Sequence, residues 1–399
     1  MRKVYFDHSA TTRVLPEVVE AMTPYFLDKF GNASSIHSFG REAKSAMEDA
    51  RTKLAGLLNA DPKEIVFTSS GTEADNLAIK GVATFKGRSK GHIITSKIEH
   101  SAVLETCDFL KRSGFDVTEL PVSGEGVVDP GDVERAIRPD TVLITIMAAN
   151  NEVGTVQPIR DIGRIARSKG IPFHTDGVQA VAKIPIDVKA DNIDMLSLSA
   201  HKFHGPKGVG ALYVKKGTGI EAIIHGGGHE RGLRSSTENI PGIVGLGKAA
   251  EIAKRDMEQT TARMRALRDR MIKRVPELVP NSYVNGHRTQ RLPNNANFRF
   301  DFIEGEGLAL QLDMKGIAAS TGSACSTGSL EPSHVLLALG LTHEQAHGSL
   351  RITLGRENTE EEVDYFLQVI PGIVSKLREI SPFSEDRPVH SCEGGRCVQ

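Results

Sequence analysis

A lysine follows directly on a strand-like segment and precedes a glycine-rich turn. The approach, residues 194–199, alternates polar and apolar side chains with the two-residue period of a half-buried strand, and the segment 205–208 contains Gly-Pro and a second glycine. This setting predicts that Lys202 is held in place, although a surface lysine at a turn is the simpler alternative. A lysine fixed in a pocket can lose its proton and form a Schiff base with an aldehyde, the chemistry that anchors pyridoxal phosphate in enzymes.

A second candidate is the turn after the strand-like run 65–68, which is suited to a phosphate. Gly71 and Thr72 open a helix there, and backbone N–H groups, a glycine and hydroxyls at a helix N-terminus form an anion site. A capping box from Ser70 or Thr72 explains the same residues equally well. The turn alone therefore leaves both interpretations open.

Two polar residues, Asp176 and Gln179, follow the strand-like run 171–174. Asp176 is also suited to cap the next helix. Against a pyridoxal ring, however, an ionised carboxylate keeps the pyridine nitrogen protonated and makes the ring an electron sink. Gln179 lies near enough along the chain to reach the ring hydroxyl from the same turn.

Three further polar residues lie at or within predicted strands. His100 and Asn151 each follow a predicted strand. The near-neutral pKa of histidine suits proton transfer, and its ring can stack on another flat ring, although a structural histidine is the alternative. Arg351 lies within the late strand-like run 350–354, and a charge in this apolar setting requires an anionic partner. Because a guanidinium pairs with a carboxylate in a bidentate fork, an amino-acid substrate fits Arg351.

One cysteine, Cys325, lies in a run of small residues between two glycines, Gly322 and Gly328. This composition predicts an accessible thiol on a mobile loop rather than a buried, inert one. A free thiol titrates near about 8.5, so Cys325 needs a positive or proton-accepting neighbour to act as a nucleophile.

Composition places the chain among globular proteins with small substrates. It has 399 residues, of which 39% are hydrophobic and 25% charged, and 49 basic and 50 acidic residues give a formal net charge of -1. That balance predicts no nucleic-acid partner and no membrane surface as partner. The acid at position 7 precedes any apolar run that could form a signal peptide, the apolar run 142–149 is too short to span a membrane, and four cysteines are too few for a disulfide framework. We therefore expect a cytoplasmic protein.

Helical and strand-like segments alternate up to about residue 250. The pattern predicts an α/β fold whose large domain has a mostly parallel sheet covered by helices on both faces, with ligands at the carboxyl ends of the strands. From about residue 260, a long charged helix, short strands and a last helix near 359–379 predict a smaller α+β domain. We assign residues 15–260 to the large domain, 1–14 and 261–380 to the small domain that carries the Cys325 loop, and 381–399 to a flexible tail.

Taken together, these residues resemble the cysteine desulfurases of the NifS/IscS type, which are fold-type-I pyridoxal phosphate enzymes of the class V aminotransferase family. The resemblance covers about residues 4–380. Its matching stretches are Asp7–Thr12, Phe30–Asn32, Ser199–Lys202, His225–Arg231, Arg234–Thr237 and Gly322–Cys325. The turn 69–73 departs from the family's Ser-Gly-Ala-Thr-Glu, because its glycine stands directly before the threonine.

The resemblance implies a role for each candidate residue. Around the cofactor ring, Lys202 binds the aldehyde, Asp176 pairs with the pyridine nitrogen, Gln179 contacts the ring hydroxyl and His100 stacks on the ring. The residues implied to hold the phosphate are Thr72, the Gly71 backbone, Ser199, His201 and, from the partner subunit of a homodimer, Thr237. Asn151 is implied to lie beside cofactor and substrate, Arg351 to bind the substrate carboxylate, and Cys325 to accept the sulfur.

The implied reaction removes sulfur from L-cysteine and leaves L-alanine and a persulfide on Cys325. An iron–sulfur scaffold protein of the NifU/IscU type is the implied acceptor, and Cys325 is expected to contact iron or a cluster only during transfer, with no resident metal. A selenocysteine lyase or a class V aminotransferase are alternatives on the same fold. A metal-binding scaffold that uses His225, His229 and the tail cysteines Cys392 and Cys397 is an alternative of another class, although the three glycines between the histidines disfavour a helix.

Overall fold

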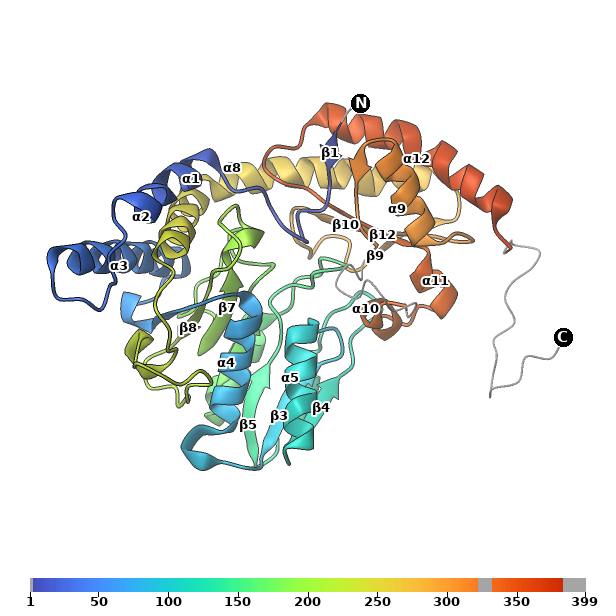
Figure 1. The fold of residues 1–399 in the computed structure, drawn as a ribbon. Coiled ribbons are helices and arrows are strands. Elements are labelled where there is room, and N and C mark those ends of the chain that lie inside the picture. The colour runs from blue at the N-terminus through green and yellow to red at the C-terminus, as the bar shows by residue number, and fades with distance from the viewer. Residues whose placement is uncertain (1–2, 322–331, 383–399) are drawn as a thin grey trace.

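The chain folds around a mainly parallel sheet (Figure 1). The computed structural model describes residues 3–321 and 332–382. Within this part, the largest sheet has seven strands in the order β2-β8-β7-β6-β5-β3-β4. In chain order these are β2 (Ile65–Thr68), β3 (His92–Ser96), β4 (Asp116–Leu120), β5 (Thr141–Thr145), β6 (Phe173–Asp176), β7 (Met195–Ser199) and β8 (Gly210–Val214). Only β8 runs antiparallel to its neighbours, whereas the strands from β7 to β4 pair in parallel.

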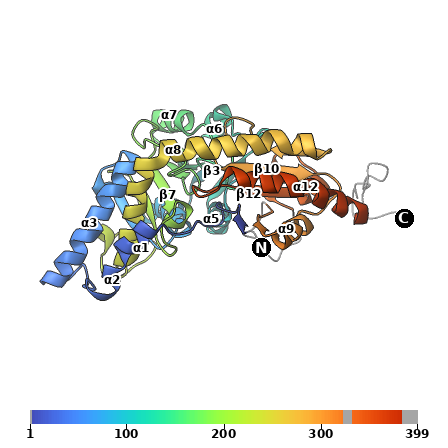
Figure 2. The same cartoon turned by 90° about the horizontal axis from the view of Figure 1, so that it is seen from above.

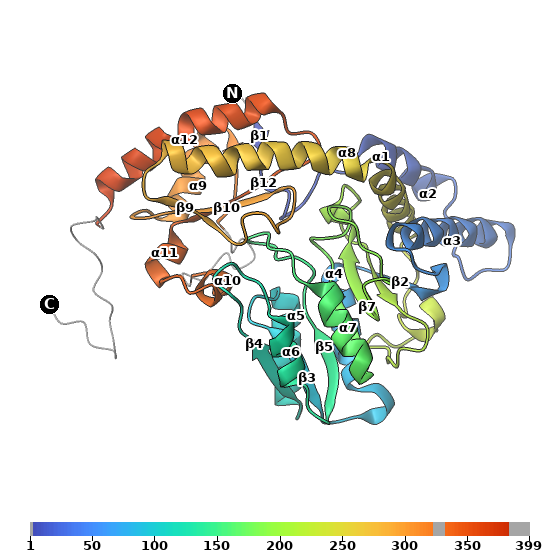
Figure 3. The same cartoon turned by 180° about the vertical axis from the view of Figure 1, so that it is seen from behind.

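Helices cover both faces of this sheet. The helices α4 (Gly71–Ala83) and α5 (Ser101–Arg112) lie on the face seen in Figure 1, and α6 (Pro130–Ala136) and α7 (Ile159–Lys169) lie on the face seen in Figure 3. Every residue of β3, β7 and β8 is buried, as expected for strands covered on both sides. The predicted α/β fold class is thereby confirmed.

One long helix, α8 (Ile240–Leu278), runs along the top of the molecule and joins its two parts (Figure 2). Its first half packs against α1 (Pro16–Met22) and α3 (Ser38–Leu58), beside the short α2 (Pro24–Leu27), and its second half packs against α12 (Glu360–Ile380). The helix begins well before the expected position near residue 260. The first part of α8 was not expected because its glycines weaken the helical pattern. These glycines allow α8 to approach α3 closely, since a Cβ at Gly247 would lie 2.5 Å from the Cα of Ala50.

The smaller part contains a three-stranded antiparallel sheet in the order β12-β10-β9 and a parallel pair of β1 with β11. Its elements are β1 (Val4–Tyr5), β9 (Ser282–Asn285), β10 (Asn295–Phe300), α9 (Gly305–Met314), β11 (Ile317–Ala318), α10 (His334–Ala338), α11 (His343–His347) and β12 (Ser349–Thr353). Val4 and Phe6 belong to the same hydrophobic core as residues between 264 and 374. We keep the predicted domain boundaries as a proposal, since the N-terminal strand packs with the C-terminal part.

Four short 3-10 turns complete the described elements: η1 (Pro62–Glu64), η2 (Phe85–Gly87), η3 (Ala200–Lys202) and η4 (Glu230–Gly232). No helix among the described residues is long and apolar enough to cross a membrane.

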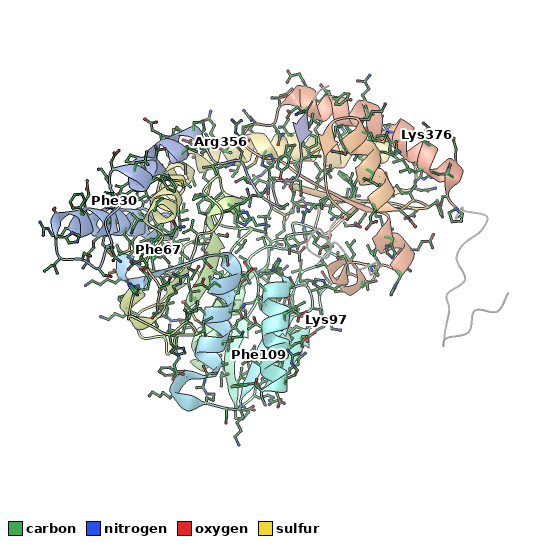
Figure 4. The ribbon with its side chains drawn as sticks, in the orientation of Figure 1. Phe30, Phe67, Lys97, Phe109, Arg356 and Lys376 are labelled. Carbon is green, nitrogen blue, oxygen red and sulfur yellow. The ribbon has the colours of Figure 1, made fainter. Side chains whose placement is uncertain are left out.

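A buried ion pair holds η4 against α3. Arg51 is 2% exposed, and its two terminal nitrogens each lie 2.8 Å from one oxygen of Glu230. The same guanidinium stacks 4.6 Å from the ring centroid of Phe67, which lies inside the molecule below α3 (Figure 4). Glu230 also accepts a hydrogen bond from the Phe67 N–H at 2.8 Å.

Replacing Arg51 by methionine is expected to lower the free energy of unfolding by about 3 to 5 kcal/mol, because the Glu230 carboxylate stays buried without its counter-charge. Urea unfolding measures the change. The control is Arg164→Met, which removes an exposed ion pair with Asp161 and is expected to cost less than about 1 kcal/mol. Equal losses in the two variants would contradict this account of the buried pair.

Candidate active site

A cavity of about 400 Å³ lies at the carboxyl ends of the parallel strands, facing the smaller sheet. Of the predicted site residues that the structure describes, all but Thr237 line it. The lining comprises Ser9, Ala10, Ser70, Gly71, Thr72, Asp75, His100, Met147, Asn151, Asp176, Val178, Gln179, Ser199, His201, Lys202 and Arg351. The structure thus brings together side chains from distant segments of the chain.

Lys202 is held at the cavity wall by the N-terminal segment. It ends η3, directly after β7, and its Nζ donates to the carbonyl oxygens of Ser9 at 2.6 Å and Ala10 at 2.9 Å. The adjacent His201 places Nδ1 3.1 Å from the Thr11 hydroxyl, and its backbone carbonyl accepts from the Thr12 N–H. Burial, and then the charge of Lys202, lower the pKa of His201 to about 4, so this ring is neutral at physiological pH.

Asp176 is the last residue of β6, and only 6% of it is exposed. The predicted strand 171–174 begins two residues later than expected, at Phe173, because the Ile171 N–H closes the end of α7 on the Ala166 carbonyl. Burial raises the pKa of Asp176, whereas the charge of His100 and a hydrogen bond from the Val178 N–H at 2.8 Å lower it. Its carboxylate is thus placed to pair with a cationic ligand group.

Gln179 is already fixed on both sides of its amide. The Nε2 atom donates to the Ser9 carbonyl at 3.0 Å, and Lys183 Nζ lies 3.4 Å from Oε1. Lys183 is 6% exposed, and burial, followed by the charge of Lys202, lowers its pKa to about 7. Lys183 was not predicted as a site residue; its signal in the sequence is a lysine inside the apolar run 180–184.

The first turn of α4 borders the cavity and has no room for a side chain at Gly71. A Cβ there would lie 2.6 Å from a methyl carbon of Val178. Ser70 is the N-cap, since its hydroxyl accepts from the Glu73 N–H at 3.1 Å, so the cap leaves the Thr72 hydroxyl available to a ligand. Glu73 also binds Arg234 at 2.8 Å, which ties this turn to the segment that carries Thr237.

Arg351 in β12 has the anionic partner that its apolar strand requires. Its Nη2 donates to Asp7 Oδ1 at 3.0 Å and its Nη1 to the Asn151 carbonyl at 3.1 Å, while Nε is buried and has no hydrogen-bond partner within residues 3–321 and 332–382. The Ser9 hydroxyl is also buried and unpartnered. Buried polar groups without partners at a cavity point to a polar ligand that would satisfy them.

His100 caps α5, and its Nδ1 accepts a hydrogen bond from the Ala102 N–H at 3.1 Å. In the neutral ring this assigns the proton to Nε2. The preceding residue, Glu99, is fully buried and accepts from the Met147 N–H, and burial raises its pKa to about 8.

Several predicted features lie away from this cavity or outside the described residues. Thr237 is exposed and is not part of the cavity wall. Cys325, Cys392 and Cys397 lie outside the residues that the structure describes. His225 and His229 do not lie on a helix, so the helical ligand spacing considered for a metal scaffold is absent from this segment.

Comparisons with known proteins identify the relatives of this chain. Residues 4–366 match the model of the aminotransferase class-V family. The chain is 57% identical to a protein named cysteine desulfurase IscS from Methanosarcina thermophila, over 96% of this chain and 95% of the relative, and 53% identical to cysteine desulfurase IscS from Dictyoglomus turgidum, over 96% and 98%. A solved NifS-like protein superposes with a TM-score of 0.88 at 45% identity, covering 94% of this chain and 100% of that one. A second structure, SspA in complex with cysteine, superposes with a TM-score of 0.79 at 42% identity, covering 90% and 100%.

The fold and the site define a class-V aminotransferase, and the chain belongs to that family and, within it, to the cysteine desulfurases. The resemblance on which the sequence analysis relied is confirmed. Enzymes of this family use pyridoxal phosphate, and the cavity fits such a group: it combines a lysine, a buried carboxyl, a glycine that leaves no room for a side chain, and unpartnered polar atoms at Ser9 and Arg351.

Proposed function

We propose that this chain removes the sulfur of L-cysteine, releasing L-alanine and leaving a persulfide on Cys325. The observation that carries the proposal is the convergence of Lys202, Asp176 and Arg351 on one cavity, in a chain that belongs to the cysteine desulfurases. A lysine for proton transfer, a carboxylate for a pyridinium and a guanidinium for a carboxylate are the groups that this reaction requires.

We propose that pyridoxal phosphate binds in this cavity and supplies an electron sink for the Cα carbanion of the substrate. Asp176 would hold the ring nitrogen, and His100 would stack on the ring. Gln179 would contact the ring hydroxyl, which requires its amide to exchange its present contacts with Ser9 and Lys183. The residues proposed to hold the phosphate are Gly71, Thr72, Ser199, His201 and, from a partner subunit, Thr237.

Two residues would bind the substrate and begin the chemistry. Arg351 would take the carboxylate of L-cysteine, with Asn151 alongside, because its guanidinium is fixed by Asp7 and its Nε–H has no hydrogen-bond partner among the described residues. Lys202 Nζ would then accept the proton from Cα. Its present contacts with the Ser9 and Ala10 carbonyls place the amine in the cavity wall.

The sulfur step would be carried out by Cys325. Its thiolate attacks the substrate sulfur, an S–S bond forms at Cys325, and the Cβ–S bond breaks with its electron pair moving to Cβ. A proton delivered to Cβ, and the return of the Cα proton from Lys202 Nζ, complete alanine, so that cysteine and a thiol become alanine and a persulfide. We assign the thiol protons to His100: because Nδ1 accepts from the Ala102 N–H, Nε2 is the ring atom that would exchange protons with the thiols, giving up its own proton and taking one in return.

We further propose that the enzyme is a homodimer. Large apolar side chains are exposed on and beside α2 and α3, at the opposite end of the molecule from Lys376, as the position of Phe30 shows (Figure 4). They are Phe26, Leu27, Phe30, Ile36 and Phe39, with exposed fractions of 50 to 90%. A second copy of this chain would bury them, and Thr237 would then have a partner site to reach.

The acceptor of the sulfur is proposed to be an iron–sulfur scaffold protein of the NifU/IscU type. The relatives named IscS support this assignment. We also propose a cytoplasmic location, which suits a reaction that depends on a reduced thiol.

The substrate role of Arg351 can be tested by Arg351→Lys. We expect kcat/KM for L-cysteine to fall by about 10²-fold or more, mainly through KM, because an ammonium cannot form the bidentate pair with a carboxylate. Steady-state alanine formation measures the loss. The control is Arg356→Lys. Arg356 follows β12 in the same chain and binds Asp256, and this variant is expected to keep its KM. An unchanged KM in Arg351→Lys would remove the substrate role.

The proposed function itself is tested by product analysis. Purified protein loaded with pyridoxal phosphate and supplied with L-cysteine and a reducing thiol should release alanine and sulfide in equal amounts. Transfer of the amino group to a keto acid without alanine from cysteine would instead establish an aminotransferase.

A further inference from the structure

A second buried carboxyl, Asp75, lines the same cavity as Asp176 and has no part in the mechanism above. It lies in the first half of α4, it is 1% exposed, and no residue in the described part of the chain forms a hydrogen bond with its Oδ1. Desolvation makes an ionised carboxylate in such a position unfavourable unless a cation compensates it.

The groups around Asp75 supply no such cation. His174 Nε2 lies 3.6 Å from Asp75 Oδ1, but the two ring nitrogens of His174 are engaged by the Thr145 hydroxyl at 2.8 Å and the Ser197 hydroxyl at 2.9 Å. Burial lowers the pKa of His174 to about 3, so the contact is not an ion pair. Glu99, the next acid, is itself buried, and its pKa is raised to about 8.

Asp176 differs from Asp75 in its surroundings. The charges of His100 and Lys202 favour its ionised form, and it accepts a hydrogen bond from the Val178 N–H. For Asp75, burial and then the negative charge of Asp176 raise the pKa well above its usual range, opposed by a hydrogen bond with Ser197. Two carboxyls that share a buried site do not both ionise, and the one without cationic neighbours takes the proton.

We propose that Asp75 is a positioning residue that shares the cavity with Asp176 as a neutral acid, so that the negative charge of the pair stays on Asp176, where the pyridine nitrogen would bind. This inference rests on the proposed cofactor site. Asp75 acts through Asp176. If Asp75 were ionised, a second negative charge would lie beside Asp176, the carboxylate that would bind the pyridine nitrogen.

The test uses the apoprotein, so its outcome does not depend on whether the enzyme is a desulfurase. If Asp75 is neutral when folded, it ionises on unfolding above about pH 4, and unfolding is favoured increasingly as pH rises toward the folded pKa. Asp75→Asn removes this penalty. We therefore expect the melting temperature of Asp75→Asn minus that of the wild type to increase from pH 5 to pH 8, by on the order of 3 °C.

Two companion variants identify the cause. Asp161→Asn changes an exposed acid on α7 and should show no such pH-dependent gain. In an Asp176→Asn background, the gain from Asp75→Asn should shrink, because the charge of Asp176 has been removed. A melting-temperature difference that is constant with pH, or that falls as pH rises, would overturn the proposal, and so would a gain that is undiminished in the Asp176→Asn background.

Infrared spectroscopy gives a second readout if Asp75→Asn folds poorly. The wild-type apoprotein at pH 7 should show the carbonyl band of a protonated carboxylic acid that is missing in Asp75→Asn or in Asp75→Ser. If both variants keep this band, Asp75 is ionised in the wild type and the proposal is overturned.

Discussion

Lys202→Ala is expected to abolish alanine formation from L-cysteine, with a loss of about 10⁴-fold or more. The variant lacks both the amine that would attach the cofactor and the base for the Cα proton, and general base catalysis alone contributes about 10² to 10⁴-fold. The side chain also ties η3 to the N-terminal segment through the Ser9 and Ala10 carbonyls, so its removal opens the cavity wall.

Borohydride reduction followed by peptide mass analysis separates attachment from turnover. The wild-type protein should carry the reduced cofactor on the peptide that contains Lys202, and Lys202→Ala should carry none. Lys207→Ala, an exposed lysine of the same turn, is the matched control and should keep both the attachment and the activity. If Lys202→Ala retained a covalently attached cofactor or a tenth of the turnover, Lys202 would not be the anchoring residue.

Cys325→Ala is expected to have the opposite profile: full cofactor content, but no persulfide and at least about a 10²-fold loss of sulfide release. The cavity residues that would hold the cofactor come from other segments, so the substitution leaves them in place. The nucleophile for the substrate sulfur, however, is missing, and water or an added thiol is a poor substitute for a positioned thiolate.

Visible absorbance of the bound cofactor and sulfide release in the presence of a reducing thiol measure the two properties. The matched control is the double variant Cys392→Ala, Cys397→Ala, which removes the two tail thiols and should leave both properties unchanged. Normal sulfide release by Cys325→Ala would exclude its role. A complete loss in the tail variant would assign the nucleophile to the tail instead.

Much of this site could be predicted because a parallel sheet gathers the ends of its strands at one edge. His100, Asn151 and Asp176 were located by this rule, and all of them line the cavity. Lys202 follows from the same rule, since η3 begins directly after β7.

Residues that reach the cavity from a distant segment could not be found in this way. Ser9 contacts Lys202 across the chain, and Asp7 meets Arg351, which is 344 positions away. Asp75 and Lys183 were missed because each is a lone polar residue within a helix or an apolar run, and only the fold shows that it is buried. The family motif at residues 7–12 pointed to this segment, but its contacts with Lys202 and Arg351 could be seen only in the fold.

The fold was predicted better in class than in detail. The strands β4 and β8 were not expected, because β4 has mixed polarity and β8 follows a glycine-rich turn without a clear alternation. β4 lies at one edge of the seven-stranded sheet, whereas β8 lies between β2 and β7 and makes the sheet mixed by running antiparallel to both. Neither change affects the parallel strand ends that form the cavity.

The most direct test of the central claim is to trap the sulfur on this chain. The protein loaded with pyridoxal phosphate is mixed with one equivalent of L-cysteine without a reducing thiol, alkylated and digested. The mass of each cysteine-containing peptide is measured, and the alanine formed is quantified. The account predicts one added sulfur on the Cys325 peptide for each alanine formed, and none in Lys202→Ala. Alanine without a persulfide at Cys325, or a persulfide confined to Cys107, Cys392 or Cys397, would contradict it.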